Sequence, residues 1–200
     1  MITIINDGMG NLRSVEKAFK FLGAETVVTS CQEDIENASK IVLPGVGHFK
    51  KGMENLVKLS LVEVLTRKVK VDKVPVLGIC LGMQLMTRHS EEGEVSGLGW
   101  VNAKTKLFKT KDKKIKVPHM GWNNISVKKK SSLIDIDNQF YFVHSFFVEA
   151  DSDELVLTTT DYIMPFTSAF EDKNIIGVQF HPEKSHSAGL KLLNNFITKY

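Results

Sequence analysis

Apolar runs alternate with helical spacing through the first half of the chain. Four runs have the length and β-branched content of buried strands: residues 2–5, 26–29, 40–44 and 74–79. Apolar positions three and four residues apart predict helices over 12–22 and 50–71. Strands that alternate with helices over short connections predict a parallel sheet with right-handed crossovers.

The pattern changes after residue 97, where the apolar runs become shorter and alternate with polar residues. They lie at 98–107, 115–117, 125–127, 141–148, 155–160, 168–170 and 175–180. This texture predicts antiparallel strands and hairpins, followed by a last helix over 187–198. We therefore expect one α/β domain over residues 1–200, with a mostly parallel central sheet between helices and antiparallel additions in its C-terminal half.

The composition is that of a soluble globular protein, with 42% hydrophobic and 24% charged residues. Two cysteines give no disulfide framework and no metal-binding spacing. No apolar run approaches the roughly 18 residues of a membrane span, so a cytoplasmic protein with no membrane partner is expected. Lysines are crowded at 104–116 and 128–130, but they contain no arginine and fall where turns are expected. A solvated face is favoured over a nucleic-acid site.

A cysteine stands where the run at 74–79 gives way to helical spacing. Gly78 and Gly82 flank Cys80 at two residues on each side, which suits a sharp strand-to-helix turn that presents the thiol. The N-terminus of the following helix would favour the thiolate. On this segment alone, a nucleophile and a buried structural thiol remain equally good interpretations.

Two other strand ends carry candidate chemistry. His181 follows the run at 175–180, and Glu183 stands two residues further on, a spacing that puts both on one face of an extended segment. A polar strand terminator is the alternative, and His144, within an apolar run, is expected to be a core or rim histidine. Gly45, Val46 and Gly47 follow another strand and could direct a backbone amide at an anion or oxyanion. Nothing fits the longer nucleotide-binding patterns.

Together these segments are far more specific than each alone. The runs 78–84 and 177–185, with Pro44–Gly47 upstream, resemble the class I, triad-type glutamine amidotransferases. Within that family the chain is similar, over essentially its whole length, to glutaminase subunits of imidazole glycerol phosphate synthases. Further matching segments are 8–12, 44–49, 118–123 and 141–145.

The resemblance implies the matching three-layer fold and a set of residue roles. Cys80 would attack the side-chain amide of glutamine, with His181 as base and acid and Glu183 orienting it. The oxyanion would be met by the amides of Leu81 and of the Gly45–Gly47 strand end, at Val46. Glutamine would be held by Gln84, Glu92, Ser145 and Phe146, with Glu92 meeting the α-ammonium group.

The resemblance also implies a heterodimer in which a cyclase subunit receives ammonia for histidine biosynthesis. Its docking side would include Met120, Trp122, Asn123, Tyr141 and Lys184, although local packing remains an alternative for Met120 and Trp122. No metal and no cofactor are implied.

Two departures from the family keep other functions open. Relatives commonly continue His-Ser-Tyr-Arg where this chain has His144-Ser145-Phe146-Phe147, and begin Asp-Tyr-Gly where it has Asn6-Asp7-Gly8. A paralogue that supplies ammonia to a synthase amidating a sugar would keep the same triad. A catalytically silent binding module, a cysteine protease and a γ-glutamyl hydrolase are further alternatives.

Overall fold

A computed structural model of the protein describes residues 1–112, 114–136 and 138–200, so Lys113 of the lysine-rich segment lies outside the described residues. The strands are β1 (Ile2–Ile5), β2 (Thr26–Thr29), β3 (Ile41–Gly45), β4 (Val76–Cys80), β5 (His89–Ser90), β6 (Val95–Ser96), β7 (Ala103–Leu107), β8 (His119–Val127), β9 (Asn138–His144), β10 (Phe146–Ala150), β11 (Val156–Asp161), β12 (Pro165–Asp172) and β13 (Ile175–Val178). The helices are α1 (Leu12–Phe21), α2 (Gln32–Glu36), α3 (Phe49–Lys58), α4 (Leu61–Lys70), α5 (Leu81–Leu85), the 3₁₀ helix η1 (Pro182–Lys184) and α6 (His186–Lys199).

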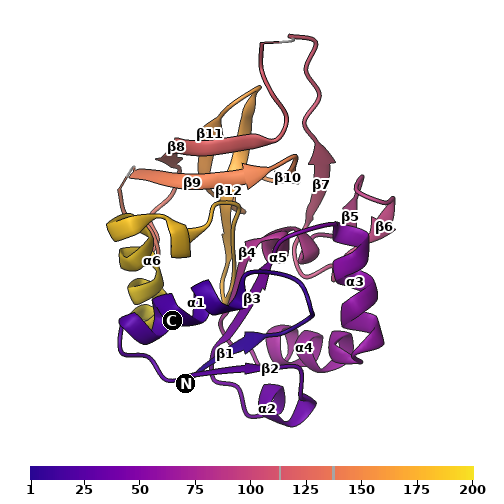
Figure 1. The fold of residues 1–200 in the computed structure, drawn as a ribbon, viewed down its shortest axis with the longest axis vertical. Helices are drawn as coiled ribbons and strands as arrows, with labels where there is room; N and C mark the ends of the chain where they lie inside the picture. The colour runs from indigo at the N-terminus through magenta and orange to yellow at the C-terminus, as the bar shows by residue number, and fades with distance from the viewer. Residues whose placement is uncertain (113, 137) are drawn as a thin grey trace.

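The central sheet lies between two helical layers (Figure 1). Its strands run in the order β2-β1-β3-β4-β13-β12-β10-β7-β5-β6, and the neighbours from β2 to β13 are parallel. Side chains alternate between its faces, so that Ile4 joins the core under α1 and α6 whereas Ile5 joins the core under α2 to α5. The three-layer arrangement expected from the sequence is confirmed.

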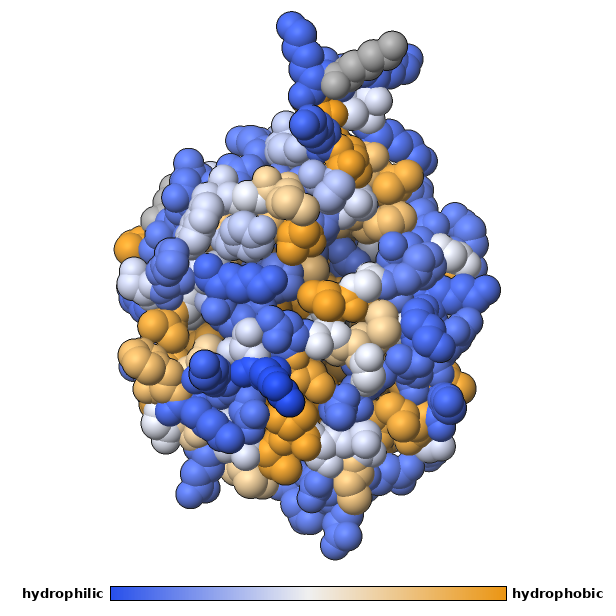
Figure 2. Space-filling model, in the orientation of Figure 1, coloured by the Kyte–Doolittle hydropathy of each residue, from blue (hydrophilic) through white to orange (hydrophobic). Residues whose placement is uncertain are grey.

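The C-terminal half adds antiparallel strands, as expected. Strand β12 pairs with β13, β10 and β11 in antiparallel fashion, and β11 in turn pairs with β8. Strands β8 and β9 form a two-stranded ribbon across one end of the molecule (Figure 1). We call this pair the β8–β9 ribbon. The described residues between β7 and β8, on either side of Lys113, are largely hydrophilic and project beyond the ribbon (Figure 1 and Figure 2).

The single helix predicted over 50–71 is wrong, because two helices occupy this segment. Helix α3 ends at Lys58, and Ser60 adopts a left-handed conformation with φ of 56° before α4 begins at Leu61. The two helices bury separate apolar faces, with Leu56 at the centre of one and Leu65 in the other. The apolar spacing continues across the break, and no glycine or proline marks it.

Several predictions for the second half also need correction. Residues 115–117 form no strand, and the predicted strand over 125–127 is the end of a longer strand, β8, that begins at His119. The predicted strand over 141–148 is divided at Ser145 into β9 and β10, which pair with different neighbours. Lys104 and Lys106 lie on β7 rather than in a turn.

None of the helices in residues 1–112, 114–136 and 138–200 combines the length and apolar character that a bilayer crossing requires.

Candidate active site

Strand β4 ends in a sharp turn at Cys80. This residue has φ of 53° and ψ of −107°, and α5 begins at the next residue. The turn lies close to β3, since a Cβ atom on Gly82 would be 1.7 Å from the carbonyl oxygen of Leu43. Only glycine permits this approach. The strained strand-to-helix turn expected from the sequence is therefore present, with the cysteine at its tip and buried.

The end of β3 lies beside this turn. Gly45 and Cys80 are register partners in the parallel pair of β3 and β4. A Cβ atom on Gly45 would lie 2.9 Å from Cβ of Leu81, so that the absence of a side chain lets the strand end approach the turn. The carboxyl ends of neighbouring parallel strands thus meet at one edge, as in other open α/β sheets.

His181 and Glu183 form a buried pair behind the cysteine. Nδ1 of His181 lies 2.9 Å from Oε1 of Glu183, and both side chains are 2% exposed. Strand β13 has already ended at Val178, and Glu183 lies in η1. The contact expected from the sequence exists, but a 3₁₀ turn rather than an extended strand produces it.

Hydrogen bonds to β9 fix the position of this pair. The amide of His181 donates to the carbonyl of Tyr141 at 2.9 Å. The hydroxyl of Ser185 donates to the carbonyl of His181 at 2.6 Å and accepts from the amide of Tyr141 at 3.0 Å. Apart from its place at the end of the run 177–185, nothing in the sequence pointed to Ser185.

The electrostatics of His181 are set by two neighbouring side chains, those of Cys80 and Glu183. Burial acts against the imidazolium, but hydrogen bonding and charge from Cys80 and Glu183 outweigh it and raise the pKa of His181 to about 10. Nε2 of His181 is buried without a hydrogen-bond partner of ordinary geometry among the described residues. Because α5 has only five residues, we attribute the positive charge near Cys80 to His181 rather than to the helix dipole expected from the sequence.

The sulfur of Cys80 has two further polar neighbours. Nε2 of Gln179 donates toward Sγ at 3.7 Å, and the carbonyl oxygen of Val143 lies 3.9 Å from Sγ. Gln179 stands within the motif that includes His181, yet the sequence assigned it no role. Its contact with the sulfur makes it a residue of the site.

A cavity of about 310 Å³ opens at the sulfur. Its lining comes from the turn, the end of β3 and the junction between β9 and β10: Val46, Gly47, Cys80, Leu81, Gln84, Glu92, Pro118, Val143, His144, Ser145 and Phe146. The structure thus brings every glutamine-holding residue expected from the sequence to Cys80. It adds Pro118, Val143 and His144, and leaves Gly45, His181 and Glu183 in the wall behind. The volume suits a small ligand.

Two polar side chains are held firmly in this lining. Nε2 of Gln84 donates to the carbonyl of Phe146 at 2.9 Å and to Oε1 of Gln179 at 3.1 Å. Oε2 of Glu92 accepts from the amide of Phe49 at 2.6 Å, at the start of α3. The cavity lining thus contains an ordered amide and an ordered carboxylate, which can bind polar groups of a ligand.

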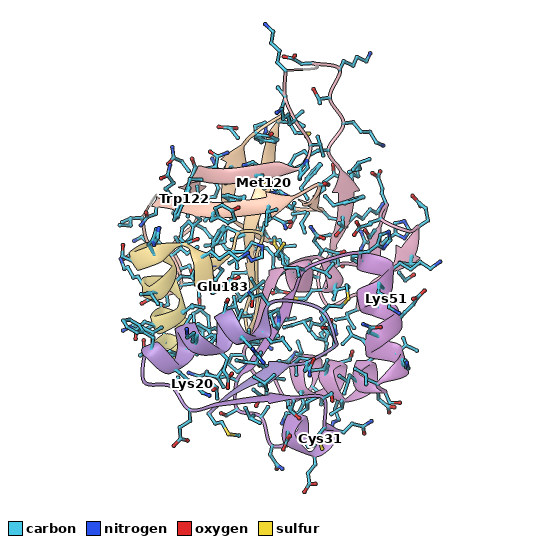
Figure 3. The ribbon with its side chains drawn as sticks, viewed as in Figure 1. Lys20, Cys31, Lys51, Met120, Trp122 and Glu183 are labelled. Carbon is cyan, nitrogen blue, oxygen red and sulfur yellow. The ribbon has the colours of Figure 1, made fainter. Side chains whose placement is uncertain are left out.

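The residues expected at a partner surface lie on the β8–β9 ribbon or in the neighbouring η1, and Figure 3 shows Met120 and Trp122 on the ribbon. Met120 is 62% exposed and Trp122 is 42% exposed. Trp122 stacks on His186 at 5.0 Å between ring centroids, and Nζ of Lys184 lies 5.8 Å from the centre of the Tyr141 ring.

Asn123 lies apart from the other residues expected at this surface. Its side chain points to the opposite face of β8, where it donates to the carbonyl of Asp161 at 2.9 Å. Alternation along the strand accounts for this separation, because adjacent side chains of a strand point to opposite faces.

Comparison with known proteins agrees with the geometry. The family model described as "Glutamine amidotransferase class-I" matches residues 3–200. The chain is 50% identical over 200 residues to "Imidazole glycerol phosphate synthase subunit HisH 2" of Methanococcus maripaludis, covering 98% of each sequence. It is 45% identical over 201 residues to "Imidazole glycerol phosphate synthase subunit HisH 1" of Campylobacter jejuni, covering 98% of the chain and 99% of that relative.

Solved structures share the fold at much lower identity. A crystal structure of a glutamine amidotransferase has a TM-score of 0.77 and 15% identity, covering 98% of this chain and 97% of the other. The structure of PurLQS from Thermotoga maritima gives 0.71 and 12% identity, with coverage of 99% and 97%.

Proposed function

The chain belongs to the class-I glutamine amidotransferases, and from this premise we propose that it is the glutaminase subunit of an imidazole glycerol phosphate synthase. In this role it hydrolyses glutamine to glutamate and ammonia and passes the ammonia to a cyclase subunit in histidine biosynthesis. The observation that carries the proposal is that Cys80 lines a small cavity while the buried His181–Glu183 pair lies behind it. Full-length relatives that bear the name of this subunit support it.

In the first half of the proposed reaction, Sγ of Cys80 attacks the side-chain carbonyl carbon of glutamine. The C–N bond then breaks while His181 protonates the departing nitrogen, which leaves as ammonia and gives a γ-glutamyl thioester. In the second half, His181 takes a proton from water, the resulting hydroxide attacks the thioester, and the C–S bond breaks to release glutamate. Glu183 keeps the ring oriented throughout.

The developing negative charge on the substrate oxygen needs hydrogen-bond donors. We assign this role to the backbone amides of Leu81 and Val46, because both residues line the cavity beside Cys80. A single donor of this type contributes about 3 kcal/mol to the transition state.

Glutamine itself is elongated and carries charges at one end. We assign Glu92 to its α-ammonium group, and Gln84 with the backbone of Ser145 and Phe146 to the rest of the substrate. The firm hydrogen bonds of Gln84 and Glu92 support this assignment, since pre-ordered groups lose little freedom when a ligand binds.

The cyclase partner is proposed to dock on the outer face of the β8–β9 ribbon. Exposed Met120 and Trp122, with Tyr141 and Lys184 beside them, give this face the aromatic and cationic character typical of interface anchors. A partner seated there would cover the ribbon next to the cavity and could receive ammonia before it is protonated in water.

Glutamine hydrolysis by the purified chain, with and without the cyclase subunit and its ligand, tests the proposal. We expect stimulation by the cyclase, and loss of turnover by at least roughly 10³-fold in Cys80→Ala. Cys31→Ala is the matched control, because this exposed cysteine lies outside the site. Turnover in Cys80→Ala equal to that of the unsubstituted protein would contradict the mechanism.

A paralogue that supplies ammonia to a sugar-amidating synthase is the second candidate. It is favoured by Phe146 in the cavity lining and Phe147 behind it, where family members commonly have tyrosine and arginine. The number attached to the relatives' names, HisH 1 or HisH 2, fits organisms with more than one such subunit. An active chain that neither binds the histidine-pathway cyclase nor responds to it would favour this candidate.

A further inference from the structure

Two buried histidines lie side by side behind the cavity wall. His119 begins β8, His144 ends β9, and the two residues are register partners in the ribbon. Nδ1 of His119 lies 3.0 Å from Nε2 of His144. His144 also lines the cavity, which makes the pair a contact between the ribbon and the site.

Each histidine has a second partner, so the pair is the middle of a longer chain of hydrogen bonds. Nδ1 of His144 lies 2.7 Å from the carbonyl oxygen of Phe146. At the other end, Nδ2 of Asn123 lies 3.2 Å from Nε2 of His119. The same Asn123 nitrogen donates to the carbonyl of Asp161.

The chemistry of these groups fixes the direction of every bond. A carbonyl oxygen only accepts, so Nδ1 of His144 must carry the proton and its Nε2 is then free to accept. Nδ1–H of His119 fills that position, which leaves Nε2 of His119 to accept from the amide of Asn123. All donors and acceptors match without any charge. A proton added to either ring would bring two N–H groups face to face.

Burial is consistent with this uncharged arrangement. Loss of hydration is the main cause that lowers the pKa of His144 to about 3 and of His119 to about 4. Both rings are therefore neutral at pH 7, as the donor order requires.

The inner end of the chain meets the residues that contact the nucleophile. The carbonyl of Phe146 also accepts from Nε2 of Gln84, whose second proton goes to Oε1 of Gln179. Nε2 of Gln179 then donates toward Sγ of Cys80. The Phe146 carbonyl lies just after Ser145, where the chain passes from the ribbon into the central sheet.

We propose that His119 and His144 are positioning residues of the glutaminase, forming a neutral, one-way hydrogen-bond chain that ties the Phe146 carbonyl and the glutamine pocket to the β8–β9 ribbon. This inference rests on the proposed function. It predicts that a displacement of β8 reaches the pocket through the two rings. The residues concerned lie on the inner face of the ribbon, away from Met120 and Trp122.

Nuclear magnetic resonance of the ¹⁵N-labelled protein at pH 7 tests the chain without reference to activity. Long-range ¹H–¹⁵N correlations distinguish the two neutral tautomers and the imidazolium form of each histidine. We expect both rings to be neutral with the proton on Nδ1. A proton on Nε2 of either ring, or a charged ring, overturns the proposal.

Kinetics of glutamine hydrolysis in the cyclase complex test the positioning role. His119→Phe keeps the stacking with Phe142 and Tyr162, at 4.8 and 4.1 Å between centroids, but removes the donor to His144. We expect KM for glutamine to rise about tenfold while kcat stays within about twofold. His119→Asn, whose amide nitrogen can replace Nδ1, should return KM to within about threefold of the original value.

The control variant is His89→Phe. His89 lies on β5 and contacts Glu94 outside the site, so its KM should not change. Melting temperatures of all variants show whether a change in KM follows a general loss of stability. An unchanged KM in His119→Phe, or an equal rise in His119→Phe and His119→Asn, overturns the positioning role alone.

The unsubstituted complex separates this result from a failure of the proposed function. If it hydrolyses no glutamine and a glutamine-analogue electrophile leaves Cys80 unmodified, both the proposed function and the positioning role are refuted. If the unsubstituted complex is active and only the KM values of the variants differ from those expected, the positioning role is refuted and the proposed function stands.

Discussion

The molecule holds two buried histidine sites that differ in charge. At the nucleophile, His181 faces Glu183 and Cys80, which raise its pKa to about 10. In the β8–β9 ribbon, His119 and His144 face each other, an amide and a carbonyl, and their pKa values fall to about 4 and 3. Burial opposes the charged form in all three rings. The partners therefore decide whether a buried histidine serves as a charged acid or as a neutral link.

The two sites also differ in how tightly the backbone around them is packed. The nucleophile turn is closely packed, because β3 and β4 approach α5 through glycines that admit no side chain. In the ribbon, by contrast, a Cβ atom on Gly121 would meet nothing within 4 Å. The nucleophile turn is therefore the more closely packed of the two backbone regions.

Removing the charge of Glu183 should have the largest effect on activity, because it leaves His181 without a charged partner, as His119 and His144 are in the ribbon. In Glu183→Gln we expect His181 to lose its proton more easily and glutamine turnover in the cyclase complex to fall about 10³-fold. Glu94→Gln is the control, since Glu94 contacts a histidine outside the site and should leave turnover unchanged. Turnover of Glu183→Gln within tenfold of the original would mean that the carboxylate does not support the ring.

Two separate glycine-to-alanine substitutions test the difference in packing between the turn and the ribbon. Gly82→Ala would place its Cβ against the Leu43 carbonyl, and we expect a loss of more than about 3 kcal/mol in the free energy of unfolding. Gly121→Ala meets no atom, but its φ of 128° strains any side chain, so about 1 kcal/mol is expected. Urea denaturation measures both, and equal losses would show that the turn is not the tighter region.

The smallest effect expected is a difference in pH dependence. The folded pKa values of His119 and His144 lie below the 6.5 of an unfolded histidine, so the unfolded chain binds protons more readily, and stability falls as the pH drops from 6.5 toward 4. For His181 the folded pKa is raised, so its contribution is complete below pH 6.5 and is lost as the pH rises toward 10.

Denaturation at several pH values separates the two slopes. Relative to the unsubstituted protein, His119→Phe should remove about 2 kcal/mol of the acid-side loss. Glu183→Gln should instead reduce the loss of stability between pH 6.5 and 10. Parallel pH curves for all three proteins would contradict the assignment of opposite charge states.

The sequence predicted the parallel half of the fold well. Its strands are buried on both faces and read as continuous apolar runs, and their short connections leave few topologies. Glycines on both sides of Cys80 identified the turn. Because the carboxyl ends of neighbouring parallel strands meet at one edge of the sheet, Gly45 lies beside this turn. In this half the signal is local, apart from the break at Ser60, where no glycine or proline marks the left-handed residue.

The first part of β8 escaped prediction because its pattern is inverted. Along β8 the polar His119 and Asn123 face inward, and the apolar Met120 and Trp122 face outward. A strand that buries polar groups against one another does not show the usual alternation. The histidine pair depends on strand register, which links residues 25 positions apart, and no spacing in the sequence reveals it.

The central claim is that Cys80 is the nucleophile that attacks glutamine. The chain provides an internal comparison, since Cys31 is exposed near α2, at the end of the molecule remote from the ribbon (Figure 3), and Cys80 is buried. The direct measurement is peptide mass spectrometry after treatment of the cyclase complex with a glutamine-analogue electrophile, and separately with iodoacetamide. The account predicts that the analogue modifies Cys80 and leaves Cys31 free, whereas iodoacetamide modifies Cys31. Modification of Cys31 by the analogue while Cys80 remains unmodified would contradict it.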